Sequence, residues 1–153
     1  MVYENIRNLR EDRDLYQENI AEHLGCAQGT YSQYERGVRD VPSRVLVMLS
    51  AFYGVSVDYL LGQTKSKSVH SRNDTAGSYT ERLFSLRKEK NLLQKQVADV
   101  LNCTQAAYFY YETGKRGIPT DVLVKLSCFY STSVDYILGL TDVKKPYSLK
   151  KGD

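Results

Sequence analysis

The sequence predicts an all-α fold made of two tandem five-helix domains. The chain repeats itself, because residues 9–64, moved forward by 77 positions, align without a gap on residues 86–141, and about half of the aligned residues are identical. Apolar residues recur at helical spacing in each copy, and no stretch of useful length alternates apolar and polar residues as a half-buried strand does. A unit of about 60 residues is marginally stable alone, so we expect the copies to pack on each other or on a second chain.

The first three helices of each copy are marked by the residues at their ends. In the first copy we expect them at about residues 3–13, 17–24 and 28–36. Gly25 closes the second helix, because glycine readily adopts the left-handed conformation found there, and Asn102 replaces it in the second copy. Gly37 and Gly114 stop the third helices in the same way.

The fourth and fifth helices carry their signals at the N-terminal end. The fourth helix starts after Pro42, and we expect Ser43, or Thr120 in the second copy, to cap it. The short fifth helix is expected to be capped by Ser56 or Ser133, with an aspartate near its positive end.

These elements divide the chain into four parts. The predicted order is a first domain at 1–64, a flexible linker at 65–78, a second domain at 79–141 and a basic tail at 142–153. The linker is polar and rich in Ser, Lys and Asn, and its random-coil span is roughly 20 Å with a stretched limit near 50 Å.

The net charge of +3 is unevenly distributed. The first domain carries six basic and nine acidic residues, whereas the second carries eight basic and six acidic ones. Only the second copy, with the linker and the tail, therefore has the bias that attracts a polyanion.

Cysteine use and hydropathy narrow the class of protein. The three cysteines form no CxxC pair, which indicates a reduced compartment without disulfides, and we expect them to be small buried residues. No run approaches the roughly 18 apolar residues of a membrane span, and the N-terminus lacks a signal-peptide core. No catalytic or metal-ligand spacing is kept in both copies. We expect a cytoplasmic, nucleoid-associated protein that is not an enzyme and uses no cofactor or metal.

Two short helices separated by a tight turn, at 17–25 and 28–36, form a helix-turn-helix motif in each copy. The motif needs a small residue where the helices cross, a residue that tolerates the turn, and an aromatic residue that reaches the core. These are Ala21, Gly25 and Tyr31 in the first copy and Ala98, Asn102 and Tyr108 in the second.

Both copies resemble the phage-repressor and Cro-type helix-turn-helix family, often called Xre-like. The resemblance covers nearly all of each copy, from IRNLRED and QENIAEHLG through YSQYERG to GVSVDYLLG, and the closing SVDYLLG and SVDYILG are especially characteristic. It implies that the third helix of each domain enters the DNA major groove while the start of the second helix lies on the DNA backbone.

Matched residue by residue, the resemblance implies DNA-binding residues in both copies. Gln17 and Gln94 match the family glutamine that holds a phosphate and braces the third helix. Gln28 and Gln105 take the first exposed position of that helix, where an amide can pair bidentately with adenine. The other expected reading positions are Gly29, Ser32 and Gln33 in the first copy and Ala106, Phe109 and Tyr110 in the second, and the expected phosphate-facing cations are Arg36, Arg39, Lys115 and Arg116.

The resemblance also implies structural roles. Arg10 with Glu35, and Arg87 with Glu112, match a family ion pair that ties the first helix to the third. Helical spacing, rather than the resemblance, predicts four tyrosines in the core, namely Tyr31, Tyr34, Tyr108 and Tyr111.

Two departures from the family pattern concern helix caps. Tyr16 and Leu93 stand where the family favours Ser, Thr or Asn before the second helix. The third helix has the cap Thr104 in the second copy but Ala27 in the first. The acidic first copy is therefore expected to be the poorer DNA binder.

These features predict a sequence-specific DNA-binding transcriptional regulator, and more narrowly a repressor, that acts as an intramolecular pseudo-dimer or a homodimer on double-stranded DNA. The alternative is a protein-interaction module, an adaptor or antagonist, that keeps the fold with reduced readout of DNA. Phe109 and Tyr110 leave both open, because they can touch thymine methyl groups or form an apolar patch for a protein partner.

Overall fold

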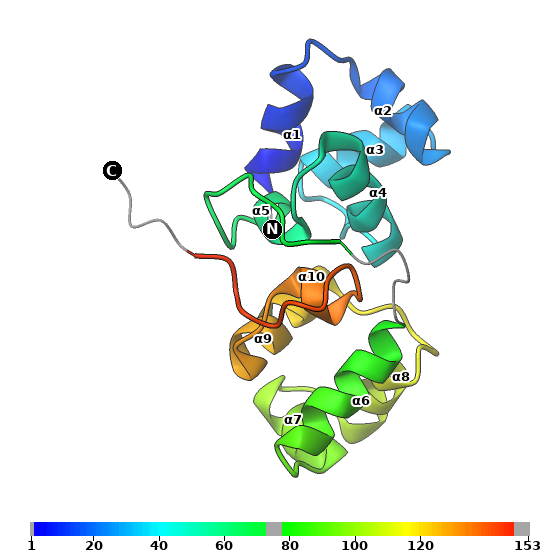
Figure 1. Ribbon diagram of the computed structural model, residues 1–153. Helices are drawn as coiled ribbons and strands as arrows, with labels where there is room; N and C mark the ends of the chain where they lie inside the picture. The colour runs from blue at the N-terminus through cyan, green and yellow to red at the C-terminus, as the bar shows by residue number, and fades with distance from the viewer. Residues whose placement is uncertain (1, 73–77, 149–153) are drawn as a thin grey trace. The chain divides into compact units, whose positions relative to one another are not determined.

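The structure is a computed structural model that describes residues 2–72 and 78–148. Within these ranges the regular elements are all helices, and the one extended pairing is a single bridge between Arg72 and Thr141. The predicted all-α fold is therefore confirmed (Figure 1). The chain forms two compact units, one from residues 1–69 with the segment that starts at Tyr147, and one from residues 70–146.

Unit 1 contains the first set of five helices, α1 to α5. Their bounds are α1 Glu4–Glu11, α2 Gln17–Leu24, α3 Gln28–Glu35, α4 Ser43–Tyr53 and α5 Val57–Leu60. Helix α3 packs on α2 and α1, and α5 packs on α1 and α4. The fully buried side chains at the centre of this unit include Ile6, Ile20, Tyr31, Leu46 and Leu49.

Unit 2 repeats the arrangement with α6 to α10. Their bounds are α6 Tyr79–Glu89, α7 Gln94–Val100, α8 Gln105–Glu112, α9 Thr120–Tyr130 and α10 Val134–Ile137. Helix α8 packs on α7 and α6, and α10 packs on α6 and α9. The predicted core tyrosines are buried in both units, namely Tyr31, Tyr34, Tyr108 and Tyr111.

Most of the predicted helix ends are confirmed. Gly25 and Asn102 both have the expected positive φ, at 68° and 53°. Ser56 Oγ accepts a hydrogen bond from Tyr59 N at 3.0 Å, and Ser133 caps α10 in the same way.

The predicted caps of the fourth helices were wrong. Ser43 and Thr120 are the first helical residues of α4 and α9, and the cap positions are Pro42 and Pro119, without a side-chain hydrogen bond. Proline fixes the extended backbone before the first turn but offers no side-chain acceptor.

The cysteines are less buried than predicted. Cys26 and Cys103 are half-buried, and Cys128 is exposed on α9. The position of Cys128 corresponds to Ala51, which is also exposed, so the repeat itself places this residue on an outer helix face.

The domain boundaries at 1–64, 65–78, 79–141 and 142–153 remain predictions. Residues 73–77 of the predicted linker and 149–153 of the predicted tail lie outside the described residues. Among the residues that the structure describes, no helix is long and apolar enough to cross a membrane.

Candidate nucleic-acid interface

The helix-turn-helix of each unit is held by the residues that the sequence marks for it. Ala21 and Ala98 are buried where the second helix meets the third, and Tyr31 and Tyr108 are fully buried. The turn closes with a hydrogen bond from Cys26 N to Ala21 O at 3.0 Å, and unit 2 has the same bond at the same distance. The exposed face of α3 or α8 is therefore fixed relative to the rest of its own unit.

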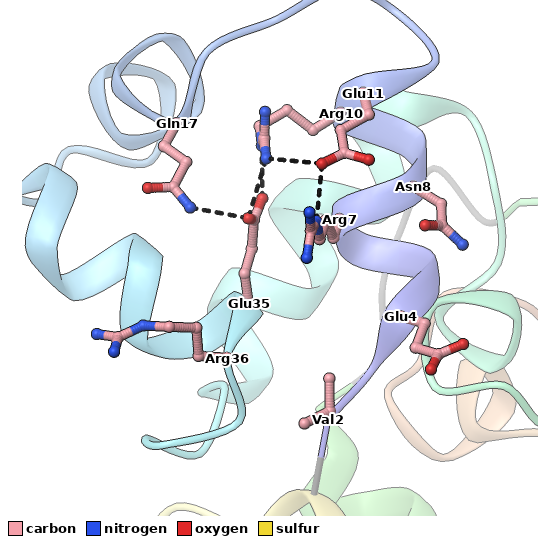
Figure 2. Close-up of a pocket in the computed structure, with 9 residues that line it drawn as sticks. All are labelled: Val2, Glu4, Arg7, Asn8, Arg10, Glu11, Gln17, Glu35 and Arg36. Carbon is pink, nitrogen blue, oxygen red and sulfur yellow. Dashed lines mark hydrogen bonds and ion pairs between the residues drawn. The ribbon is translucent and has the colours of Figure 1, made fainter.

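An ion pair between the half-buried Arg10 and the buried Glu35 ties α1 to α3 (Figure 2). Arg10 Nε and Nη2 donate hydrogen bonds to the two carboxylate oxygens of Glu35 at 2.6 and 3.1 Å, and Arg10 Nη1 donates to Leu15 O at 2.7 Å. Gln17 Nε2 donates to Glu35 Oε2 at 2.9 Å. Burial raises the pKa of the Glu35 carboxyl, but the hydrogen bonds from Arg10 and Gln17 outweigh it, so this pKa lies below its ordinary value.

Unit 2 reproduces the same network. Arg87 Nε and Nη2 donate to the Glu112 carboxylate at 2.9 and 2.7 Å, and Gln94 Nε2 lies 3.5 Å from Glu112 Oε1. Burial raises the pKa of the Glu112 carboxyl, but the hydrogen bond from Arg87 helps to outweigh it, so this pKa also lies below its ordinary value. Both predicted ion pairs are thus present, and each glutamine at the start of the second helix is oriented by the buried carboxylate.

The glutamines that begin the third helices face solvent. Gln28 and Gln105 are both exposed. Gln28 Nε2 lies 3.4 Å from Gln17 Oε1, so the amide that starts α3 lies beside the amide that starts α2.

The remaining predicted positions of unit 1 lie along and after α3. Gly29 is exposed, Ser32 and Gln33 are half-buried, and the two cations Arg36 and Arg39 are exposed. This face is polar and uncharged along the helix, with positive charge at its end.

The corresponding face of unit 2 is aromatic and carries its cations beside the rings. Ala106 is exposed, and Phe109 and Tyr110 are 37% and 38% exposed. Lys115 Nζ lies 5.3 Å from the centre of the Phe109 ring, and Arg116 Cζ lies 5.4 Å from that of Tyr110. Each ring is therefore paired with a cation at a distance typical of cation–π contacts.

Asn19 and Gln96 are residues that the sequence analysis missed. Tyr16 N donates to Asn19 Oδ1 at 2.8 Å, and Leu93 N donates to Gln96 Oε1 at 2.7 Å. In a capping box, the residue three positions after the cap accepts a hydrogen bond from the backbone N–H of the cap residue. Asn19 and Gln96 do so here, although the side chain of the cap residue makes no capping hydrogen bond of its own. An amide three residues after the cap was the available signal, and it steadies the start of α2 and α7 without a Ser or Thr.

A hollow of about 730 Å³ lies between α1 and the end of α3, and Figure 2 labels the residues that line it. Its lining places Glu4, Glu11 and Glu35 among three arginines. Arg7 Nε lies 2.7 Å from Glu11 Oε1, so much of this charge is balanced locally. Among the described residues, no group of three or more His, Cys, Asp or Glu side chains is arranged to hold a metal ion.

Comparison with known proteins fits this geometry. A family profile described as helix-turn-helix matches residues 6–60 and again residues 83–137, which together make up more than half of the chain. The chain belongs to this helix-turn-helix family. The resemblance to Xre-like and phage-repressor domains is thereby confirmed, and the family comprises regulators rather than enzymes.

Relatives of the family include bacterial and phage regulators. The chain is 43% identical over 68 residues to the uncharacterized HTH-type transcriptional regulator YobD of Bacillus subtilis, with 44% of this chain and 61% of YobD covered. It is 35% identical over 66 residues to the cryptic phage CTXphi transcriptional repressor RstR of Vibrio cholerae, covering 43% and 60%. It is 31% identical over 88 residues to the HTH-type transcriptional regulator ImmR of Bacillus subtilis, covering 58% and 69%. The chain thus spans about 60% of the length of YobD and RstR.

Proposed function

We propose that this protein is a sequence-specific DNA-binding transcriptional regulator, and that it represses transcription by occupying its operator. The observation that carries the proposal is the position of Gln28 and Gln105, exposed at the start of α3 and α8. Behind them, Gln17 and Gln94 are oriented by a buried carboxylate. The similarity to a phage repressor supports the narrower role.

In this proposal α3 and α8 enter the major groove. An exposed glutamine amide offers a donor and an acceptor together, which matches N6 and N7 of adenine. Gln17 and Gln94 bind a backbone phosphate at the start of α2 and α7, where the helix dipole also favours an anion. The cations after the third helices add phosphate contacts, namely Arg36, Arg39, Lys115 and Arg116.

The two units read different half-sites. The face of α3 is made of Gly29, Ser32 and Gln33, whereas α8 presents Phe109 and Tyr110. Aromatic side chains contact the methyl group of thymine, and the cation beside each ring favours an anionic partner such as DNA. We therefore assign thymine contacts to α8 and polar contacts to α3.

The active species places two reading helices about 34 Å apart on the DNA, one helical turn. Two units in one chain can supply both helices as a pseudo-dimer, and a homodimer can supply two from each chain. Its site of action is the nucleoid, where the operator lies.

The proposal is tested by affinity for a duplex selected from random sequence. Gln105→Ala and Tyr110→Ala should each weaken binding by about 1–3 kcal/mol and relax the preference at one base pair. Gln63→Ala, which changes the same residue type after α5, is the matched control and should bind like the wild type. Unchanged affinity and preference in both interface variants would contradict the proposal.

A second candidate function rests on the same two aromatic residues. Phe109 and Tyr110 also suit an adaptor or antagonist that binds a protein partner, because paired exposed rings are frequent in interfaces. A salt titration separates the two functions. A DNA complex weakens steeply as salt rises, whereas a complete lack of DNA affinity at low salt would favour the interaction module.

A further inference from the structure

The repeat continues past the helices into the segments that follow them. Thr64 and Thr141 occupy the same position in the two copies and are 1% and 0% exposed. Thr64 Oγ1 accepts a hydrogen bond from Ser66 N at 3.1 Å, and Thr141 Oγ1 accepts one from Val143 N at 3.2 Å. The two threonines therefore turn the chain that follows them in the same way.

The next matched contact also lies within each copy. Lys67 Nζ is 5.9 Å from the centre of the Tyr59 ring, and Lys144 Nζ is 5.8 Å from that of Tyr136. Both members of these pairs are related by the repeat offset of 77 positions. As far as Lys67 and Lys144, each segment thus stays on the copy that precedes it.

Beyond these lysines the partners change. Thr141 Oγ1 donates a hydrogen bond to Ser71 O at 2.7 Å, and Thr64 Oγ1 donates one to Ser148 O at 2.9 Å. Ser71 and Ser148 are again 77 positions apart. The threonine that ends each copy therefore holds the serine that follows the other copy.

The residues that belong to each compact unit agree with these hydrogen bonds. The chain leaves unit 1 after Val69 and returns to it at Tyr147, whose side chain is only 7% exposed. Arg72 forms a bridge with Thr141 inside unit 2. We propose that residues 70–72 and 147–148 are exchanged arms, each of which completes the unit built by the other copy.

The physical reason lies in the buried threonine hydroxyls. A buried hydroxyl needs an acceptor for its proton, and the arm carbonyl is that acceptor here. Exchange of equivalent segments usually joins two protomers of a homodimer. In this protein both copies are in one chain, which raises their effective concentration to about the millimolar range, so we commit to exchange within one chain.

The test cuts the chain between the arms. A protease recognition sequence is inserted between Asp74 and Thr75 of the full chain, and the purified, folded protein is cleaved and measured by gel filtration with light scattering. Each fragment then carries the arm of the other unit. We expect the cleaved protein to remain one particle of unchanged mass at micromolar concentration.

Two variants test whether the arms cause this association of the fragments. A stop after Pro146 combined with Thr141→Val removes the second arm and the hydroxyl that binds Ser71 of the first, and circular dichroism before cleavage checks that the variant is folded. Its fragments should associate at least about tenfold more weakly, whereas Thr113→Val, which removes a hydroxyl bonded locally to Phe109 O of α8, should match the parent. Separation of the parent fragments, equal association in the arm variant, or an uncut two-chain particle that becomes a single chain in the arm variant would each contradict the proposal.

Discussion

At the scale of single residues, a buried carboxylate organises each candidate interface. Glu35 is bound by Arg10 from α1 and by Gln17 from α2, and Glu112 is bound in the same way by Arg87 and Gln94. The carboxylate therefore fixes the glutamine that we assign to a phosphate while it joins the first helix to the third. Such pairs stabilise little relative to apolar residues, but losing one partner is costly.

Removing only the cation should destabilise unit 2 strongly. Arg87→Met leaves the buried Glu112 without its charge partner, and we expect the free energy of unfolding to fall by about 3–5 kcal/mol. The double variant Arg87→Met with Glu112→Leu should recover much of that loss, because it leaves no charge buried. Denaturant unfolding measures both. A single variant as stable as the wild type would contradict this role of the pair.

The same carboxylates should make stability depend on acid. The pKa of Glu35 and of Glu112 is lowered by folding, so their contribution is complete above the ordinary glutamate pKa of about 4.3 and is lost as the pH falls through the lower folded value. Glu35→Gln and Glu112→Gln should therefore lose less stability than the wild type on acidification below about pH 4. Thermal melts across this range measure it, and parallel acid profiles would contradict the assignment.

At the scale of helices, the structure explains which features the sequence could predict. The offset repeat and the apolar spacing predicted all five helix positions in each copy, and Gly25, Asn102 and Ser56 marked ends correctly. The cap at Ser43 was misassigned because proline at the preceding position already sets the extended backbone. The hydrogen bond that Asn19 accepts from Tyr16 N was missed because the cap residue, Tyr16, gives no signal of its own.

Helix α3 should be easy to stabilise toward the sequence of α8. Its cap position is Ala27, without a side-chain hydrogen bond, where α8 has Thr104 bonded to Ala107 N at 3.1 Å. Gly29 has no atom within 4 Å of an added Cβ. We expect Ala27→Thr and Gly29→Ala each to stabilise unit 1 by about 0.5–1 kcal/mol.

The reverse changes in α8 are the matched controls. Thr104→Ala and Ala106→Gly should each destabilise unit 2 by about 1 kcal/mol. Thermal unfolding of the four variants measures both sets. Stability changes in the opposite directions would mean that the cap residue and helix propensity do not limit the stability of the third helices.

At the scale of the whole molecule, the two copies have similar internal packing but different side chains on the exposed faces of their third helices. The buried residues, the ion pair and the glutamines recur at the same offset, whereas the side chains along α3 and α8 differ. The repeat could therefore predict the internal packing of each domain. It could not predict which bases each exposed face contacts, because those contacts depend on the DNA sequence. The exchanged arms escaped prediction because a polar segment with few apolar residues carries no helical or strand periodicity.

The central claim, that two different reading helices in one chain bind one DNA site, is tested most directly by selecting bound duplexes from random DNA with the intact protein. We predict one enriched site made of two unlike halves, whose centres lie about one helical turn apart. Thymine should be preferred in the half whose sequence preference is weakened by Tyr110→Ala. Enrichment of a perfect palindrome, or no enrichment of any sequence, would contradict it.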